Sequence, residues 1–187
     1  MSKRTALLIL AAAGLGLGGC TGTAIKEGAG LALGARGSVT VLTPIDPNPE
    51  ARPLGAYQRF KLAPLTDDMK GHAPAGLADD LPAEFEKQLA AKKIPNAAAG
   101  KTLLIRGKVL HYEGSSTIGK ALGPVEFVVA RVELVDESAG KVLGEANCVG
   151  RTTARVNLGV AKKAQGLAKA IVHWIDSRFP DDRRATD

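Results

Sequence analysis

Cys20 is the residue whose type and position most clearly indicate chemistry. Gly18 and Gly19 stand immediately before it, and they follow a positively charged start and an apolar run from Ala6 to Gly16. This order is typical of a secreted precursor, which is cut beside small residues after a short apolar segment. We therefore predict a signal peptide over residues 1–19, with cleavage between Gly19 and Cys20 and a cysteine thiol at the new amino terminus.

The four residues Leu17, Gly18, Gly19 and Cys20 resemble the lipobox of bacterial lipoproteins, in which an apolar residue and two small residues precede the modified cysteine. The resemblance implies a diacylglyceryl thioether on Cys20 and, in many bacteria, a fatty acid such as palmitate on its amino group. Several acyl chains anchor a protein stably, whereas one chain binds only marginally. Because Thr21 stands where an aspartate would favour inner-membrane retention, the resemblance favours the outer membrane, facing the periplasm.

The other reactive residue types form no recognisable constellation. The spacing of the three histidines does not match a zinc site, and Ser115 to Thr117 lack the Gly-x-Ser-x-Gly setting of a nucleophile. Cys148 falls in a strand pattern, which favours a small buried residue over a reactive thiol. We therefore expect no catalytic residue, no metal site and no cofactor.

One loop is a candidate for contact with a partner. Residues 114–124 are rich in glycine, yet they carry Ile118, Lys120 and Leu122, and the two apolar side chains have no evident core to join. Exposed apolar groups on a loop can bind a partner or a membrane. An ordinary mobile hairpin loop is the alternative interpretation of the same residues.

Charge and composition narrow the class of protein. The formal net charge of +6 becomes +4 when Lys3 and Arg4 leave with the signal, and aromatic residues make up only 4% of the chain. A nucleic-acid-binding surface usually has a basic stripe with interleaved aromatics. The composition therefore argues against nucleic acid as a partner and favours an aliphatic core of one domain.

The chain divides into a tether, one domain and a tail. Residues 20–53 are rich in Gly, Ala and Pro, with Val39 to Leu42 as a candidate short edge strand. This composition is typical of a tether that holds a domain away from a surface. Regular patterning covers residues 54–179, and residues 180–187 after the last helix are expected to be disordered.

Hydrophobic periodicity predicts an α+β domain with two layers in the order β-α-β-β-β-α. Alternating segments indicate a mainly antiparallel sheet of about four strands, and two segments with helical period indicate helices packed on one face. Gly144, Ala146, Cys148 and Gly150 share one strand face, where small side chains would let the last helix approach closely. The predicted strands are 57–65, 102–113, 125–136 and 142–152. The predicted helices run from a cap at Asp79 or Asp80 to a stop before Pro95, and from 160 to 178.

A second resemblance concerns the domain. The run Leu103 to Val109, the glycine-rich loop, the strand end Leu134 to Asp136, the turn to Gly140 to Leu143 and the Ala-rich last helix look like an uncharacterised family of small bacterial lipoproteins. That family is similar to the amino-terminal α/β domain of TolB and to the periplasmic domain of curli-type secretion lipoproteins. The shared motifs are structural, so the resemblance implies a fold and no activity.

These observations together predict a lipid-anchored envelope lipoprotein. We expect a non-catalytic module that contacts membrane lipid through the acylated Cys20 and that binds an unknown envelope protein or itself. The alternative is a small-ligand carrier or an enzyme, with a pocket at the strand and loop ends near His111, Tyr112 and Glu113.

Overall fold

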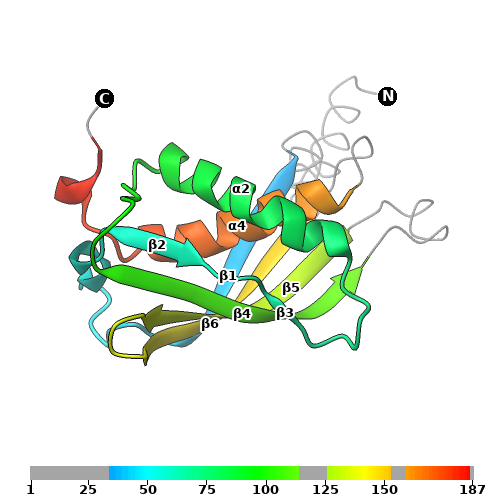
Figure 1. Cartoon of the computed structure of the whole chain (residues 1–187), viewed down its shortest axis with the longest axis horizontal. Helices are drawn as coiled ribbons and strands as arrows, with labels where there is room; N and C mark the ends of the chain where they lie inside the picture. The colour runs from blue at the N-terminus through cyan, green and yellow to red at the C-terminus, as the bar shows by residue number, and fades with distance from the viewer. Residues whose placement is uncertain (1–33, 114–125, 153–158, 186–187) are drawn as a thin grey trace, which may run out of the picture. The chain divides into compact units, whose positions relative to one another are not determined.

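A six-stranded sheet and two long helices are the main elements of the described residues (Figure 1). The computed structural model describes residues 34–113, 126–152 and 159–185. No helix among these residues has the length and hydropathy needed to cross a membrane. The elements are β1 (Ala35–Thr43), η1 (Pro53–Ala56), β2 (Arg59–Leu62), β3 (Thr66–Asp67), α2 (Ala75–Ala91), β4 (Thr102–Glu113), β5 (Glu126–Asp136), β6 (Lys141–Thr152), α4 (Val160–Asp176) and η2 (Asp181–Arg183).

The strands lie in the order β1-β6-β5-β4-β2, and β3 also pairs with β4. Neighbours from β1 to β4 are antiparallel, as predicted. In contrast, β2 and β3 run parallel to β4 because α2 crosses over between them. The α+β prediction is confirmed, but four strands was too few: β1 and β3 complete a sheet of six.

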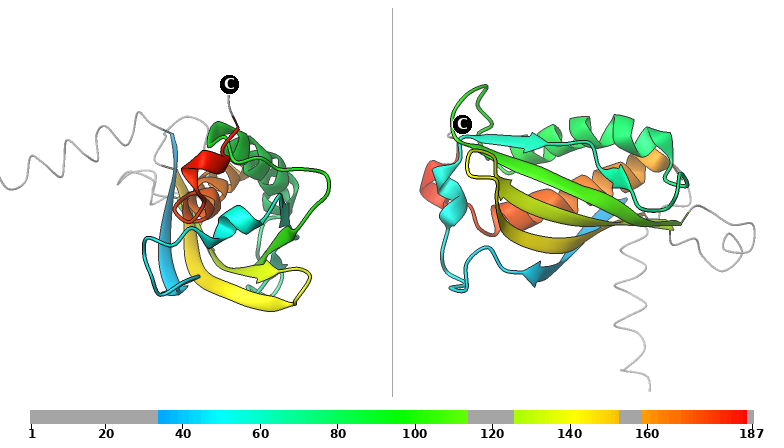
Figure 2. Two further views of the ribbon diagram at one scale, coloured as in Figure 1. Left: turned by 90° about the vertical axis from the view of Figure 1, so that its left-hand side faces the viewer. Right: turned by 60° about the horizontal axis from the view of Figure 1, so that its bottom comes forward.

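Both helices cover the same face of the sheet, and the core fills the space between the two layers (Figure 2). Alternate residues of β5 point toward the helices and are fully buried, which confirms the predicted strand pattern. The two predicted helices also bury apolar side chains against the sheet, as their helical period indicated. The buried side chains are Val128, Ala130, Val132 and Leu134 on β5, Leu81, Phe85 and Leu89 on α2, and Leu167, Ile171 and Trp174 on α4.

Glycines allow α4 to lie directly on β1 and β6. A Cβ atom at Gly150 would stand 2.5 Å from the carbonyl oxygen of Lys163, and one at Gly166 would stand 2.6 Å from the carbonyl oxygen of Arg36. Real side chains do not tolerate such distances, so backbone meets backbone here. The predicted close approach through a small-residue face is therefore confirmed.

Two segments that were predicted to lack regular structure are ordered within the described residues. Residues 35–43 form the nine-residue edge strand β1, because their β-branched side chains suit a sheet and Val39 reaches the core. At the other end, the Arg184 side chain donates to the carbonyl oxygen of Lys92 at 2.8 Å and pairs with Asp176 at 2.7 Å. These contacts order the chain after Pro180 as far as Ala185, where disorder was predicted.

Helix α2 begins earlier than the predicted cap at Asp79 or Asp80. Its first residue is Ala75, so Pro82 lies in the helix interior instead of in the first turn. An interior proline removes one helical hydrogen bond. The longer helix buries Leu77 at 3% exposure, one turn before Leu81 on the same face, and this burial offsets the cost of the proline.

Candidate interface at the β1 edge

The strongest sequence-based site residues lie outside the described part of the chain. This applies to Gly19 and Cys20 at the predicted cleavage site. It applies equally to Ile118, Lys120 and Leu122 of the candidate contact loop. Their roles stay predictions.

His111, Tyr112 and Glu113 do not converge on one pocket. Tyr112 lies on the helix-covered face, where its hydroxyl accepts a 2.8 Å hydrogen bond from the Lys163 ammonium. His111 stacks on Phe127 with ring centroids 5.1 Å apart, and Glu113 is exposed. Because successive side chains of a strand point to opposite faces, His111 and Glu113 lie on the other side of the sheet from Tyr112.

A buried ion pair at this end of the sheet was missed from the sequence. The Lys163 ammonium lies 2.6 Å from a carboxylate oxygen of Glu126, and the two side chains are 2% and 3% exposed. Lys163 belongs to the predicted helix 160–178, where a lysine is expected to face solvent. It stands one turn before the buried Leu167, so the helical period itself carried a signal for its burial.

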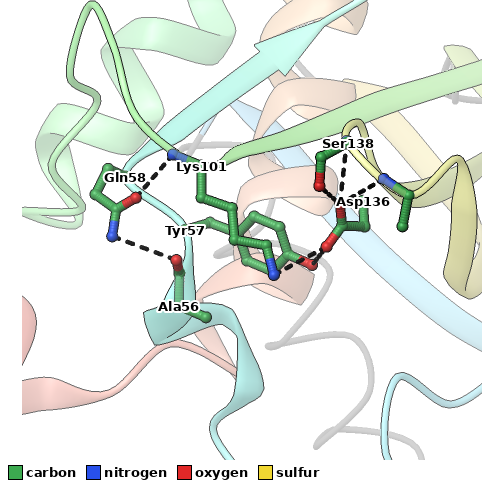
Figure 3. A network of polar contacts seen from close by, with 7 residues as sticks. Ala56, Tyr57, Gln58, Lys101, Asp136 and Ser138 are labelled. Atoms are coloured by element: carbon green, nitrogen blue, oxygen red, sulfur yellow. Dashed lines mark hydrogen bonds and ion pairs between the residues drawn. The ribbon is translucent and has the colours of Figure 1, made fainter.

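A second polar cluster closes the opposite end of the sheet (Figure 3). The Asp136 carboxylate accepts hydrogen bonds from the Tyr57 hydroxyl at 2.9 Å and the Ser138 hydroxyl at 2.6 Å. The Lys101 ammonium lies 2.9 Å from the same carboxylate and 4.7 Å from the Tyr57 ring centroid. The cluster thereby joins the segment before β2, the start of β4 and the turn between β5 and β6.

The charges in this cluster are fixed near neutral pH. The hydrogen bond from Ser138, followed by that from Lys101, holds the pKa of Asp136 far below its ordinary range. Burial, together with the hydrogen bond to Asp136, raises the pKa of Tyr57 far above its ordinary value. Asp136 is therefore ionised and Tyr57 protonated around pH 7, so neither exchanges a proton readily there.

We predict that Asp136→Asn lowers the free energy of unfolding at neutral pH. The free energy of unfolding of the variant should also depend less on pH in the acid range. A lowered folded-state pKa means that ionised Asp136 stabilises the fold above its unfolded-state pKa of about 3.9. That contribution is lost as the pH falls through the folded-state pKa, so the stabilities of the two proteins should converge in acid. Urea unfolding between pH 7 and pH 2 measures this, with Asp79→Asn on exposed α2 surface as the control. A gap that stays constant with pH would contradict the assignment.

The described residues also contain the Cys148 thiol and side chains of the types that bind metals. Cys148 is fully buried, which confirms its predicted role as a small core residue, and burial raises the pKa of its thiol to about 12. No three His, Cys, Asp or Glu side chains in the described ranges gather as metal ligands would.

The outer edge of β1 is open among the described residues. Within the described residues β1 pairs only with β6, so its other side presents backbone N–H and C=O groups without a strand partner. Residues 37–43 contain neither a charge nor a proline, the usual protections of an edge. Val41 and Leu42 are 45% and 44% exposed, and Val142 on β6 is the third large apolar side chain so exposed in the described ranges.

The opposite edge of the sheet is protected and interrupted. It consists of the four-residue β2 and the two-residue β3, with Pro64 between them and with Arg59 and Lys61 exposed. A short edge with charges and a proline resists pairing along its length. The two edges of this sheet are therefore unlike.

An apolar cavity of about 150 Å³ opens between the interrupted edge and α2. The carboxylate of Asp67 is at its rim, but that group accepts backbone hydrogen bonds from Met69 at 2.6 Å and Gly71 at 2.7 Å. Backbone N–H groups of the loop that follows β3 therefore bind this carboxylate. The main apolar lining residues are Leu62, Leu65, Leu77, Leu81 and Val109.

Comparison with known proteins identifies a class of fold. No protein-family model and no curated protein matches the chain. Two crystal structures of PelC from Paraburkholderia phytofirmans, the first of a single-substitution variant and both dodecamers, are similar to this chain. The first is 16% identical with a TM-score of 0.52, and the match covers 76% of this chain and 98% of PelC. The second is 15% identical with a TM-score of 0.50, and the match covers 75% of this chain and 97% of PelC.

A DUF330 protein from Xanthomonas campestris is a more distant neighbour. It is 14% identical with a TM-score of 0.36, over 74% of this chain and 89% of its own. At the identities found for PelC, the likeness concerns the fold alone. The described domain is thus an α+β domain with a PelC-like fold.

Proposed function

We propose that the mature chain is a bacterial envelope lipoprotein, anchored through an acylated Cys20 in the outer membrane. In this proposal its α+β domain is a non-catalytic assembly module that associates with itself through the edge of β1. The unprotected edge with exposed Val41 and Leu42 is the observation that carries the proposal.

Two further observations support assembly over catalysis. PelC, which shares the fold, is described as a dodecamer, so this two-layer architecture is compatible with self-association. The polar clusters at the two ends of the sheet are internally paired, around Glu126 and Lys163 at one end and around Asp136 at the other. Paired charges of this kind tie elements together and leave little capacity for reaction with a substrate.

We predict that Cys20→Ala abolishes acylation. The wild-type chain should incorporate a fatty-acid analogue in cells and fractionate with the outer membrane, because several acyl chains hold it there. The variant should lose the label and leave the membrane fraction. Cys148→Ala is the matched control, since that thiol is buried and should not be needed for labelling. Equal labelling of wild type and Cys20→Ala would contradict the anchor.

We predict that Val41→Lys combined with Leu42→Lys prevents self-association of the purified chain. Two half-exposed aliphatic side chains contribute about 2 kcal/mol when covered, which corresponds to roughly a thirtyfold change in dissociation constant. Native mass spectrometry of the chain released from detergent should show an oligomer for wild type and mainly monomer for the variant. Val142→Lys adds one lysine at a similarly exposed site of β6 that pairs with β5 instead of β1, and it should leave the mass of the oligomer unchanged. Identical oligomers for all three proteins would show that the β1 edge is not the surface of self-association.

A further inference from the structure

We propose that copies of this chain assemble head to tail, with Val41 and Leu42 of one copy entering the apolar cavity beside α2 of the next. This inference rests on the proposed self-association through β1. It adds the surface that receives the strand and the symmetry that follows from it.

The register of the sheet places the two surfaces at the same height. Val41 pairs with Ala146, Ala146 with Val132, and Val132 with Gly107 across β1, β6, β5 and β4. The cavity lies beyond β4 at that level, because Leu62 pairs with Ile105 and Asp67 pairs with Val109. The exposed apolar residues and the cavity thus stand at opposite ends of one row across the sheet. Figure 2 shows β1 and α2 on opposite sides of the domain.

Both surfaces also lie on the helix side of the sheet. Ala146 is fully buried beneath the helices, so its partner Val41 occupies the same face. The cavity wall includes Leu77 and Leu81, which belong to α2 on that face. A sideways displacement of one copy, without turning it over, would therefore bring Val41 toward the cavity of its neighbour.

Size and polarity fit an aliphatic occupant. An apolar cavity of about 150 Å³ can hold a molecule such as benzene. A branched aliphatic side chain is similar to benzene in size. Leu42 is the extra residue at the irregularity in the pairing of β1 with β6, between Val41 and Thr43. A residue at such a bulge is released from the regular ladder and can be directed away from its own sheet.

Strand directions are compatible with this contact. β1 is antiparallel to β6, and the alternation through β5 and β4 makes it antiparallel to β2 and β3. A neighbouring copy in the same orientation would thus place β1 antiparallel to the β2–β3 edge. Proline at position 64 interrupts that edge where the cavity opens, so side-chain insertion replaces a continuous backbone ladder there.

Unlike surfaces on each copy make the contact heterologous. Every copy then offers one β1 edge and one cavity, and repetition produces a closed ring or an open chain. A two-fold dimer through two β1 edges would leave both cavities unused. The two arrangements therefore make opposite predictions for variants of the cavity.

Ala78→Trp tests the inference because Ala78 lines the cavity and is exposed on α2, so the indole should fill the cavity without disturbing the core. We expect this variant to be monomeric by native mass spectrometry, like Val41→Lys with Leu42→Lys. An equimolar mixture of the two variants should form a dimer and nothing larger, since one intact β1 edge meets one intact cavity. Ala90→Trp, an exposed site near the end of the same helix, should assemble as wild type does. Thermal unfolding of each variant checks that its fold is retained.

The outcomes separate this inference from the proposed function. If Ala78→Trp assembles like wild type while the β1 variant is monomeric, the head-to-tail contact is wrong and self-association through β1 stands. If both variants are monomeric but their mixture gives no dimer, the cavity does not receive β1 and the inference is overturned. A monomeric wild type would overturn both proposals.

Discussion

Lys163→Met is expected to lower the free energy of unfolding by about 3–5 kcal/mol, the largest loss that we predict for a single substitution. The change leaves the carboxylate of Glu126 buried without its partner at 2.6 Å, and an uncompensated buried charge is costly. It also removes the donor to the Tyr112 hydroxyl. For a domain of this size the midpoint of thermal unfolding should fall by about 10 °C.

The double substitution Lys163→Met with Glu126→Leu distinguishes pairing from simple packing. Removing both charges should recover most of the stability, to within about 1 kcal/mol of wild type, because apolar groups of similar size can replace a buried ion pair. Lys162→Met, at the neighbouring half-buried position, is the control and should change stability little. Urea unfolding measures the free energy of unfolding of each variant, and equal m-values show that the difference from wild type is one of stability. A loss below about 1 kcal/mol for Lys163→Met alone would show that the pair is not a significant support of the fold.

Gly150→Ala is expected to destabilise the domain by about 3 kcal/mol, although alanine usually suits a strand better than glycine does. The added methyl group would meet the backbone of α4 at Lys163 and Leu167, and neither side can yield as a flexible side chain would. Either α4 moves off the sheet or β6 bends. Both responses open the core around Ile171 and Trp174.

Gly76→Ala is the matched control for that experiment. Its methyl group would lie 3.6 Å from Val160, an ordinary contact, and Gly76 is in the first turns of α2. Stability should therefore stay unchanged or rise by up to about 1 kcal/mol, since alanine restricts the unfolded chain and favours a helix. Equal effects of the two substitutions in thermal unfolding would mean that α4 can be displaced from β6 at little cost.

Local pattern was sufficient to predict the core elements. Alternation in β5 and the four-residue spacing of Leu81, Phe85 and Leu89 record which side of each element meets the core. Those signals are short-range, so they survive in a single sequence. The small residues on β6, from Gly144 to Gly150, even indicated where the last helix would rest.

Long-range competition explains where the prediction was wrong. The sequence predicts a helix start at Asp79 or Asp80, but burial of Leu77 extends α2 by a turn. Arg184 looked like part of a frayed tail until Asp176 and the end of α2 supplied its partners. In each case the deciding contact joins residues that local patterning cannot bring together.

The sequence by itself determined the main helices and strands of the domain, and it predicts an export and lipidation signal at the beginning of the chain. Only the tertiary structure decided that His111 and Tyr112 face opposite sides of β4 and that Lys163 is buried against Glu126. It alone placed Val41 on the same row as an apolar cavity at the far edge of the sheet. Strand register and sheet order are set by packing across the whole domain, so the surfaces that depend on them have no local signature in the chain.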